Sequence, residues 1–115
     1  MTIIGNMTSK RPKPLTPQKL RQKIARALKK YGYRLGKKDG KAHLRSRDVI
    51  VNDLVNVVKS LDAEITAEWV ENWQKYRYNF DTDIFTVVMT FDVPGFVVFI
   101  TAWRKTKEGR APHVD

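Results

Sequence analysis

The sequence predicts an α+β fold in which two N-terminal helices pack on one face of an antiparallel sheet of three or four strands. Apolar residues recur at helical spacing in the N-terminal half, and the C-terminal third consists of β-branched and aromatic runs separated by turn signals. The length of 115 residues and the 42% of hydrophobic residues are typical of one globular domain. We therefore expect a single domain over residues 16–105, preceded by a flexible basic arm (1–15) and followed by a polar basic tail (106–115).

The first helix is expected over residues 17–31. Thr16 can cap its first turn, and Pro17 suits the first helical position, where no backbone N–H is needed. Apolar residues then follow at helical spacing: Leu20, Ile24 and Leu28. The helix is thus amphipathic, and its solvent-facing side is almost entirely basic, with Lys19, Arg21, Lys23, Arg26, Lys29 and Lys30.

A second helix is expected over residues 47–60, because apolar residues again repeat at helical spacing: Ile50, Val51, Leu54, Val58 and Leu61. Between the two helices, the segments 33–35 and 42–44 flank a polar run that contains the turn signal Asp39-Gly40. A short hairpin and a plain loop both fit this stretch.

Three strands are expected in the C-terminal part, over residues 76–80, 84–91 and 96–103, since these segments alternate in polarity or are rich in β-branched and aromatic residues. Pro94-Gly95 indicates a two-residue type II turn between the last two strands. Residues 62–74 fit both a helix and a strand, and we favour a strand or an irregular connection.

The turn sets the register of the last hairpin and hence the face on which each side chain lies. One face is almost purely apolar and should lie against the helices; it pairs Phe91 with Val98, Met89 with Ile100, Val87 with Ala102 and Phe85 with Arg104. The other face pairs Thr90 with Phe99, Val88 with Thr101, Thr86 with Trp103 and Ile84 with Lys105. This mixed face suits unpaired RNA bases and sugar-phosphates. There are two alternative interpretations of this mixed face: the sheet is covered on both sides, or Phe99 and Trp103 form a dimer contact.

The formal net charge of +10 is unevenly distributed. Residues 1–47 contain 15 Lys and Arg against one acidic residue, whereas residues 48–103 contain 3 against 9 acidic residues. This asymmetry indicates that the basic N-terminal part of the protein faces a polyanion. A basic surface that serves only solubility is the alternative, and a membrane-surface role is disfavoured because the basic helix has little apolar bulk. The chain shows no signal-peptide core and no apolar run of about 20 residues, so we expect a cytoplasmic protein with no membrane partner.

Metal chemistry is poorly supported by the sequence. The chain has no Cys and only two His, which are far apart, so no set of ligands has a recognisable spacing. Asp81 and Asp83 could hold a cation weakly, but a solvated turn is the simpler interpretation. No metal and no cofactor are expected.

RNA cleavage without a metal needs a base for the 2′-OH, cations for the charged transition state and an acid for the leaving oxygen. His43 is the candidate base, because neighbouring cations such as Arg45 and Arg47 favour its neutral form. Both arginines are candidate phosphate ligands, and their place at an expected helix start, where cations are disfavoured, favours this role over that of ordinary solvated charges. A surface histidine in a basic loop is the alternative interpretation.

The order of these features resembles that of small endoribonuclease toxins, a group that includes barnase-like, colicin-type, RelE-like and MqsR-like ribonucleases. Two stretches carry the resemblance: residues 43–61, a histidine followed by arginines at a helix start, and residues 76–105, a terminal sheet with a closing Thr and Arg. It implies metal-independent cleavage by attack of the 2′-OH, a site on the exposed sheet face, and an acidic antitoxin or immunity protein as partner. The catalytic residues that it implies are His43, Arg47, Tyr78, Thr101 and Arg104.

The expected function is therefore a metal-independent endoribonuclease. The alternative is a non-catalytic nucleic-acid-binding or host-factor-inhibiting protein, in which the first helix and the arm follow phosphates, and an inhibitor that masks a partner protein is a third hypothesis. RNA is the expected partner, with contacts from Lys19, Lys23, Arg26, Lys30, Arg45, Arg77, Phe99, Trp103 and Lys105.

Overall fold

The structure, a computed structural model, describes residues 11–36 and 40–105. The elements are α2 (Pro17–Lys30), β1 (Tyr33–Leu35), α3 (Gly40–Ser46), α4 (Val51–Lys59), β2 (Glu64–Val70), the 3₁₀ turn η1 (Glu71–Trp73), β3 (Lys75–Asp81), β4 (Phe85–Asp92) and β5 (Phe96–Arg104). The predicted tail, most of the predicted arm and the loop 37–39 lie outside the described residues.

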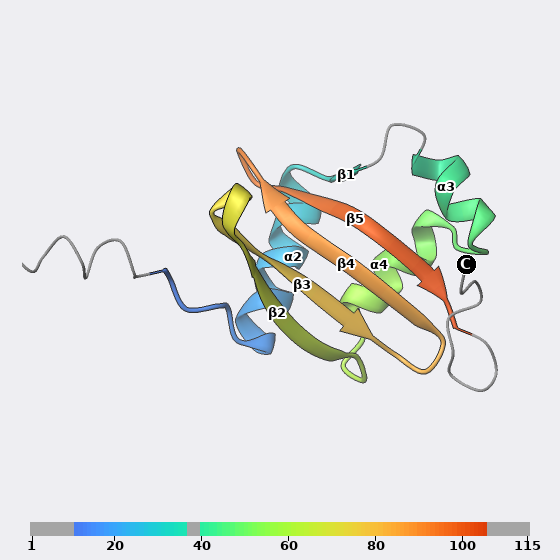
Figure 1. The fold of residues 1–115 in the computed structure, drawn as a ribbon, viewed down its shortest axis with the longest axis horizontal. Helices are drawn as coiled ribbons and strands as arrows, with labels where there is room; N and C mark the ends of the chain where they lie inside the picture. The colour runs from blue at the N-terminus through green and yellow to red at the C-terminus, as the bar shows by residue number, and fades with distance from the viewer. Residues whose placement is uncertain (1–10, 37–39, 106–115) are drawn as a thin grey trace, which may run out of the picture.

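The five strands form one mixed sheet in the order β1-β5-β4-β3-β2. Strands β2 to β5 are antiparallel to their neighbours, whereas β1 pairs in parallel with β5 at one edge. Helices α2 and α4 lie on one face of this sheet, and α3 lies beside the C-terminal end of β5 (Figure 1). The predicted α+β class is confirmed, but the prediction of three or four purely antiparallel strands is wrong.

Helix α2 matches its predicted bounds closely because its signals are local. The Thr16 hydroxyl accepts a hydrogen bond from the Lys19 amide at 3.3 Å, as expected for an N-cap. Leu20, Ile24 and Ala27 are buried against the sheet. The same spacing turns Lys19, Lys23, Arg26 and Lys30 to solvent. Arg21 is instead half-buried and donates to the Ser60 and Ala63 carbonyls at 3.2 and 3.3 Å.

The segment between the predicted helices forms neither a hairpin nor a plain loop. Residues 33–35 pair with β5. Because β5 is distant in the sequence, no local pattern predicts this pairing. Residues 40–46 form helix α3, whose Leu44 is buried. Gly40 permits a close approach at the start of this helix, because a Cβ there would lie 2.5 Å from the Cβ of Leu35.

The predicted helix over residues 47–60 begins later, at Val51. Asp48 interrupts the helical path with a φ of 59°, in the left-handed region that Asp tolerates better than most residues. A carboxylate oxygen of Asp53 accepts the Ile50 amide at 3.0 Å and so satisfies a donor at the new helix start. The chain therefore turns between α3 and α4, which places α3 beside β5.

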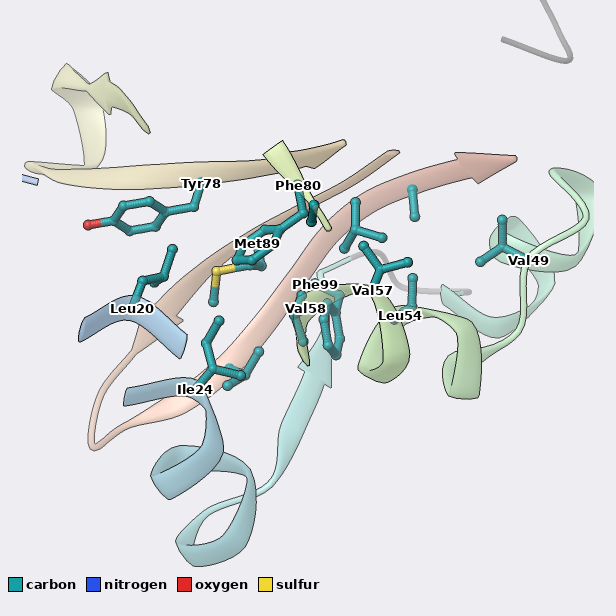
Figure 2. Close-up of a cluster of buried hydrophobic side chains, with 14 of the residues drawn as sticks. Leu20, Ile24, Val49, Leu54, Val57, Val58, Tyr78, Phe80, Met89 and Phe99 are labelled. Carbon is teal, nitrogen blue, oxygen red and sulfur yellow. The ribbon is translucent and has the colours of Figure 1, made fainter. Parts of the chain in front are cut away.

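The core lies between the two covering helices and one sheet face, as Figure 2 shows. Leu20 and Ile24 of α2 and Leu54 and Val58 of α4 are fully buried. Each buried side chain of this size contributes about 1.5–3 kcal/mol relative to an exposed one. The sheet residues that meet them include Tyr78, Phe80, Met89 and Phe99.

The last hairpin has the predicted register only in the half away from its turn. Val88 pairs with Thr101 as predicted, but a bulge next to this pair places Met89 opposite Phe99. One extra residue, Ile100, reverses the faces of the β5 residues that precede it. Phe99 is consequently in the core, 3% exposed, and the prediction that it lies on the exposed face is wrong.

The remaining strand predictions are confirmed. Strands β3, β4 and β5 match the three predicted segments to within one residue at each end, and most of the ambiguous stretch 62–74 forms β2. The connection between β4 and β5 is one residue longer than the predicted two-residue turn, since Asp92 pairs with Phe96.

Candidate nucleic-acid interface

Four of the five predicted catalytic residues come from two elements that meet, α3 with the residues just after it, and β5. The Arg47 guanidinium donates to the Thr101 hydroxyl at 3.1 Å. Arg104 donates to the Asp48 carbonyl at 3.2 Å and lies 3.0 Å from its carboxylate. His43 lies in α3, and Arg47 follows it four residues later in the turn just after this helix. These contacts fix the end of α3 against the end of β5, a junction that we call the α3–β5 junction.

The arginines of the α3–β5 junction are engaged by protein atoms. Arg47 holds a threonine hydroxyl, and Arg104 holds both the backbone and the carboxylate of Asp48. The Nε2 atom of His43 is buried. A general base must come within hydrogen-bond reach of the proton that it takes. The α3–β5 junction therefore places Arg47, Thr101 and Arg104 in contacts within the protein.

Tyr78 is not part of this junction. It lies in β3 on the core face and is 4% exposed, whereas Thr101 lies on the opposite face of β5. Burial raises the pKa of the Tyr78 hydroxyl, although the hydrogen bond from the Leu15 amide acts in the other direction. The hydroxyl therefore stays protonated at neutral pH.

The sheet face opposite α2 and α4, which we call the open face, has locally compensated charges. Arg77 pairs with Glu68 at 2.7 Å, and Lys105 pairs with Asp81 at 2.9 Å. Burial alone would raise the pKa of the Asp81 carboxyl, but hydrogen bonds from Thr86 and Lys105 and the Lys105 charge lower it. Trp103 lies on this face, half-buried. Two of the predicted RNA-binding cations are thus neutralised by neighbouring carboxylates.

The exposed side of α2 is different. Lys19, Lys23, Arg26 and Lys30 follow at helical spacing along one side of the helix, and all four are exposed. We call this row the α2 stripe. In the described part of the chain, no ion pair involves any α2 side chain, and α2 has no acidic residue. Arg45 on α3 is exposed as well.

The sequence interpretation missed an aromatic group at the edge of the sheet. The rings of Trp69 and Tyr76 lie 5.0 Å apart between centroids, and those of Tyr76 and Tyr78 lie 6.2 Å apart. Tyr76 also donates a hydrogen bond to the Pro12 carbonyl at 2.8 Å. The alternation of Tyr76 and Tyr78 in β3 is visible in the sequence. Their contacts with Trp69 of β2 and with Pro12 of the arm are long-range, so no local sequence pattern predicts them.

Within residues 11–36 and 40–105, no group of three or more His, Asp or Glu residues is arranged to hold a metal ion. No helix among these residues is both long and apolar enough to cross a membrane. Comparisons with known protein families, curated proteins and solved structures found no match to this chain.

Proposed function

We propose that this protein binds RNA through the α2 stripe. The observation that carries the proposal is that four exposed cations share one side of a helix that has no acidic residue and makes no ion pair among residues 11–36 and 40–105. Uncompensated cations attract the counterion-surrounded phosphates of a nucleic acid, and binding releases those counterions. Arg77 and Lys105 on the open face are paired with carboxylates, so we expect them to contribute less to RNA binding.

The geometry of the stripe suits a strand of phosphates. Lys19 and Lys30 are separated by about 16 Å along the helix axis, at 1.5 Å per residue. Long, flexible side chains at regular intervals contact phosphates without selecting a base sequence. We therefore expect binding of single-stranded RNA with little sequence preference at this surface.

The test compares the wild-type protein with a variant in which Lys19, Lys23, Arg26 and Lys30 are all replaced by Gln. Binding of a fluorescent, unstructured RNA oligonucleotide is measured by anisotropy at about 50 mM salt, where electrostatic binding is strong. We expect the wild type to bind and the variant to lose most of its affinity while keeping its circular dichroism spectrum. Equal affinity of the two folded proteins would contradict the proposal.

Metal-independent RNA cleavage at the α3–β5 junction is a second candidate function. The observation that favours it is the contact between Arg47 and Thr101, which are 54 residues apart in the sequence, with His43 on the helix that leads to Arg47. The candidate predicts that purified protein shortens labelled RNA in the presence of EDTA and that His43→Ala abolishes this activity without changing thermal unfolding. Intact RNA after incubation with folded wild type would exclude cleavage and leave the binding proposal standing.

A further inference from the structure

A cavity of about 480 Å³ opens where the described part of the arm, α2 and the β4–β5 turn meet. Its lining includes Lys13 of the arm, Lys23 of α2, Tyr76 of β3 and Phe91 of β4. A volume of this order is within the range of small-molecule sites, roughly 300–1,000 Å³. The cavity is large enough for a compact organic ligand.

The arm forms one wall of this cavity and is held in place by two tyrosines. Tyr76 donates to the Pro12 carbonyl at 2.8 Å, and the Leu15 amide donates to the Tyr78 hydroxyl at 3.1 Å. Arg11 lies over the Trp69 ring at 5.5 Å, which adds a third contact. These contacts hold residues 11–15 against the sheet and so give the cavity a defined shape.

The lining combines aromatic rings with three lysines and one carboxylate, that of Asp92. The Lys23 ammonium lies 4.3 Å from the Phe91 ring centre, and no ion pair to Lys13 or Lys23 exists among the described residues. Lys75 also lines the cavity, but it donates to the Phe91 carbonyl and lies 3.8 Å from the Asp92 carboxylate. Aromatic side chains beside two lysines that make no ion pair among the described residues suit a ligand that has both a flat ring system and a negative charge.

Lys23 belongs both to this cavity and to the α2 stripe, so the two features are continuous. We propose that the cavity holds one unpaired nucleotide of a bound RNA strand, with its base against Tyr76 and Phe91 and its phosphate beside Lys13 and Lys23. The inference rests on the proposed RNA binding and deepens it. Stacking of a base on an aromatic side chain contributes without reading the sequence, whereas the lysines act on the phosphate.

The first test maps a small probe onto the full-length protein by amide chemical shifts. Adenosine 5′-monophosphate is expected to shift the amides of Leu15, Tyr76 and Gly95, which belong to the cavity lining. Inorganic phosphate alone is expected to give clearly smaller shifts at the same amides, because it has no base. Equal shifts from phosphate alone, or shifts confined to other parts of the protein, would overturn the inference.

The second test places a carboxylate at the cavity rim. Val93 lines the cavity and is 82% exposed, so Val93→Glu is compatible with folding. A negative charge roughly 7 Å from the ligand phosphate should weaken RNA binding about threefold at the dielectric constant of water. Val93→Lys should not weaken it. Equal affinities of the Glu and Lys variants would overturn the inference.

Ile84→Glu is the matched control. Ile84 is also an exposed apolar residue, but it precedes β4, whereas Val93 follows this strand. The two positions are about 30 Å apart along an extended strand, which is well beyond the Debye length of about 10 Å at 0.1 M salt. The control should therefore bind RNA almost as the wild type does, and a loss equal to that of Val93→Glu would overturn the inference.

Failure of this inference is distinguishable from failure of the proposed function. If the wild type binds RNA through the α2 stripe while adenosine monophosphate leaves the cavity amides unchanged, the cavity assignment is wrong and RNA binding stands. If the monophosphate shifts these amides while RNA does not bind, the cavity takes a free nucleotide and the proposed function is wrong.

Discussion

Replacing Arg26 by Gln removes one cation from the middle of the α2 stripe and changes little else. Arg26 is exposed, and Arg and Gln have nearly equal helix propensities, so α2 should keep its stability. Each phosphate contact with a single strand contributes about 0.7 to the slope of log affinity against log salt. The variant should therefore show a slope smaller by about 0.7 and, at about 0.1 M salt, an affinity about fivefold lower.

The control is Arg77→Gln, which changes the net charge of the protein by the same amount. Arg77 lies on the open face and pairs with Glu68 at 2.7 Å, so it has little free charge for a phosphate. Its slope should stay within about 0.2 of the wild-type value. The assay is RNA anisotropy over a series of salt concentrations. Equal changes in slope for Arg26→Gln and Arg77→Gln would refute the argument, because total charge and not the α2 stripe would then govern binding.

Three further predictions concern the framework of the site. Arg47→Met and Thr101→Val should show a coupling free energy of about 1 kcal/mol in a urea double-mutant cycle, since each removes the same hydrogen bond; additive losses would contradict the contact. Phe99→Ala should lower the free energy of unfolding in urea by about 3–5 kcal/mol, and Ile100→Ala should lower it much less. Equally small decreases for the two variants would mean that the Phe99 ring is not in the core. Because the pKa of Asp81 is lowered, its carboxylate stabilises the fold above the ordinary carboxyl pKa, and this stabilisation is lost as pH falls through the lowered pKa. Asp81→Asn should therefore make the free energy of unfolding fall less steeply below about pH 4. An unchanged dependence of that free energy on pH in this range would contradict the prediction.

The sequence predicted those parts of the fold whose signals are local. Thr16 and Pro17 mark the start of α2, and the spacing of its apolar residues places the cations on the solvent side. The β-branched and aromatic runs predicted β3, β4 and β5 for the same reason. The α2 stripe was therefore available from sequence, because it depends on one helix alone.

Long-range pairings were not predictable in the same way. β1 is three residues long, and the strand with which it pairs, β5, lies far from it in the sequence. The bulge at Ile100 depends on the fit of the whole hairpin, and it moved Phe99 from the expected interface into the core. Arg47 and Thr101 were grouped only by a family resemblance, and no spacing in the sequence requires the contact between them.

The aromatic cavity shows the same limit for function. Tyr76 and Phe91 are strand residues, and their roles in a site depend on the docking of the arm through Pro12 and Leu15. Proline in the arm excludes helix and ladder hydrogen bonds, so the sequence pointed to a flexible segment. In the described part of the arm, the Pro12 carbonyl and the Leu15 amide have tyrosine hydroxyls as partners, which only the folded sheet provides.

The most direct test of the central claim is the salt dependence of wild-type binding to a single-stranded RNA. Four phosphate contacts from the α2 stripe predict a slope of log affinity against log salt of about −3, which is an affinity loss of about fiftyfold between about 50 and 200 mM salt. A slope near zero, or no binding at the lower salt concentration by correctly folded protein, would contradict the account.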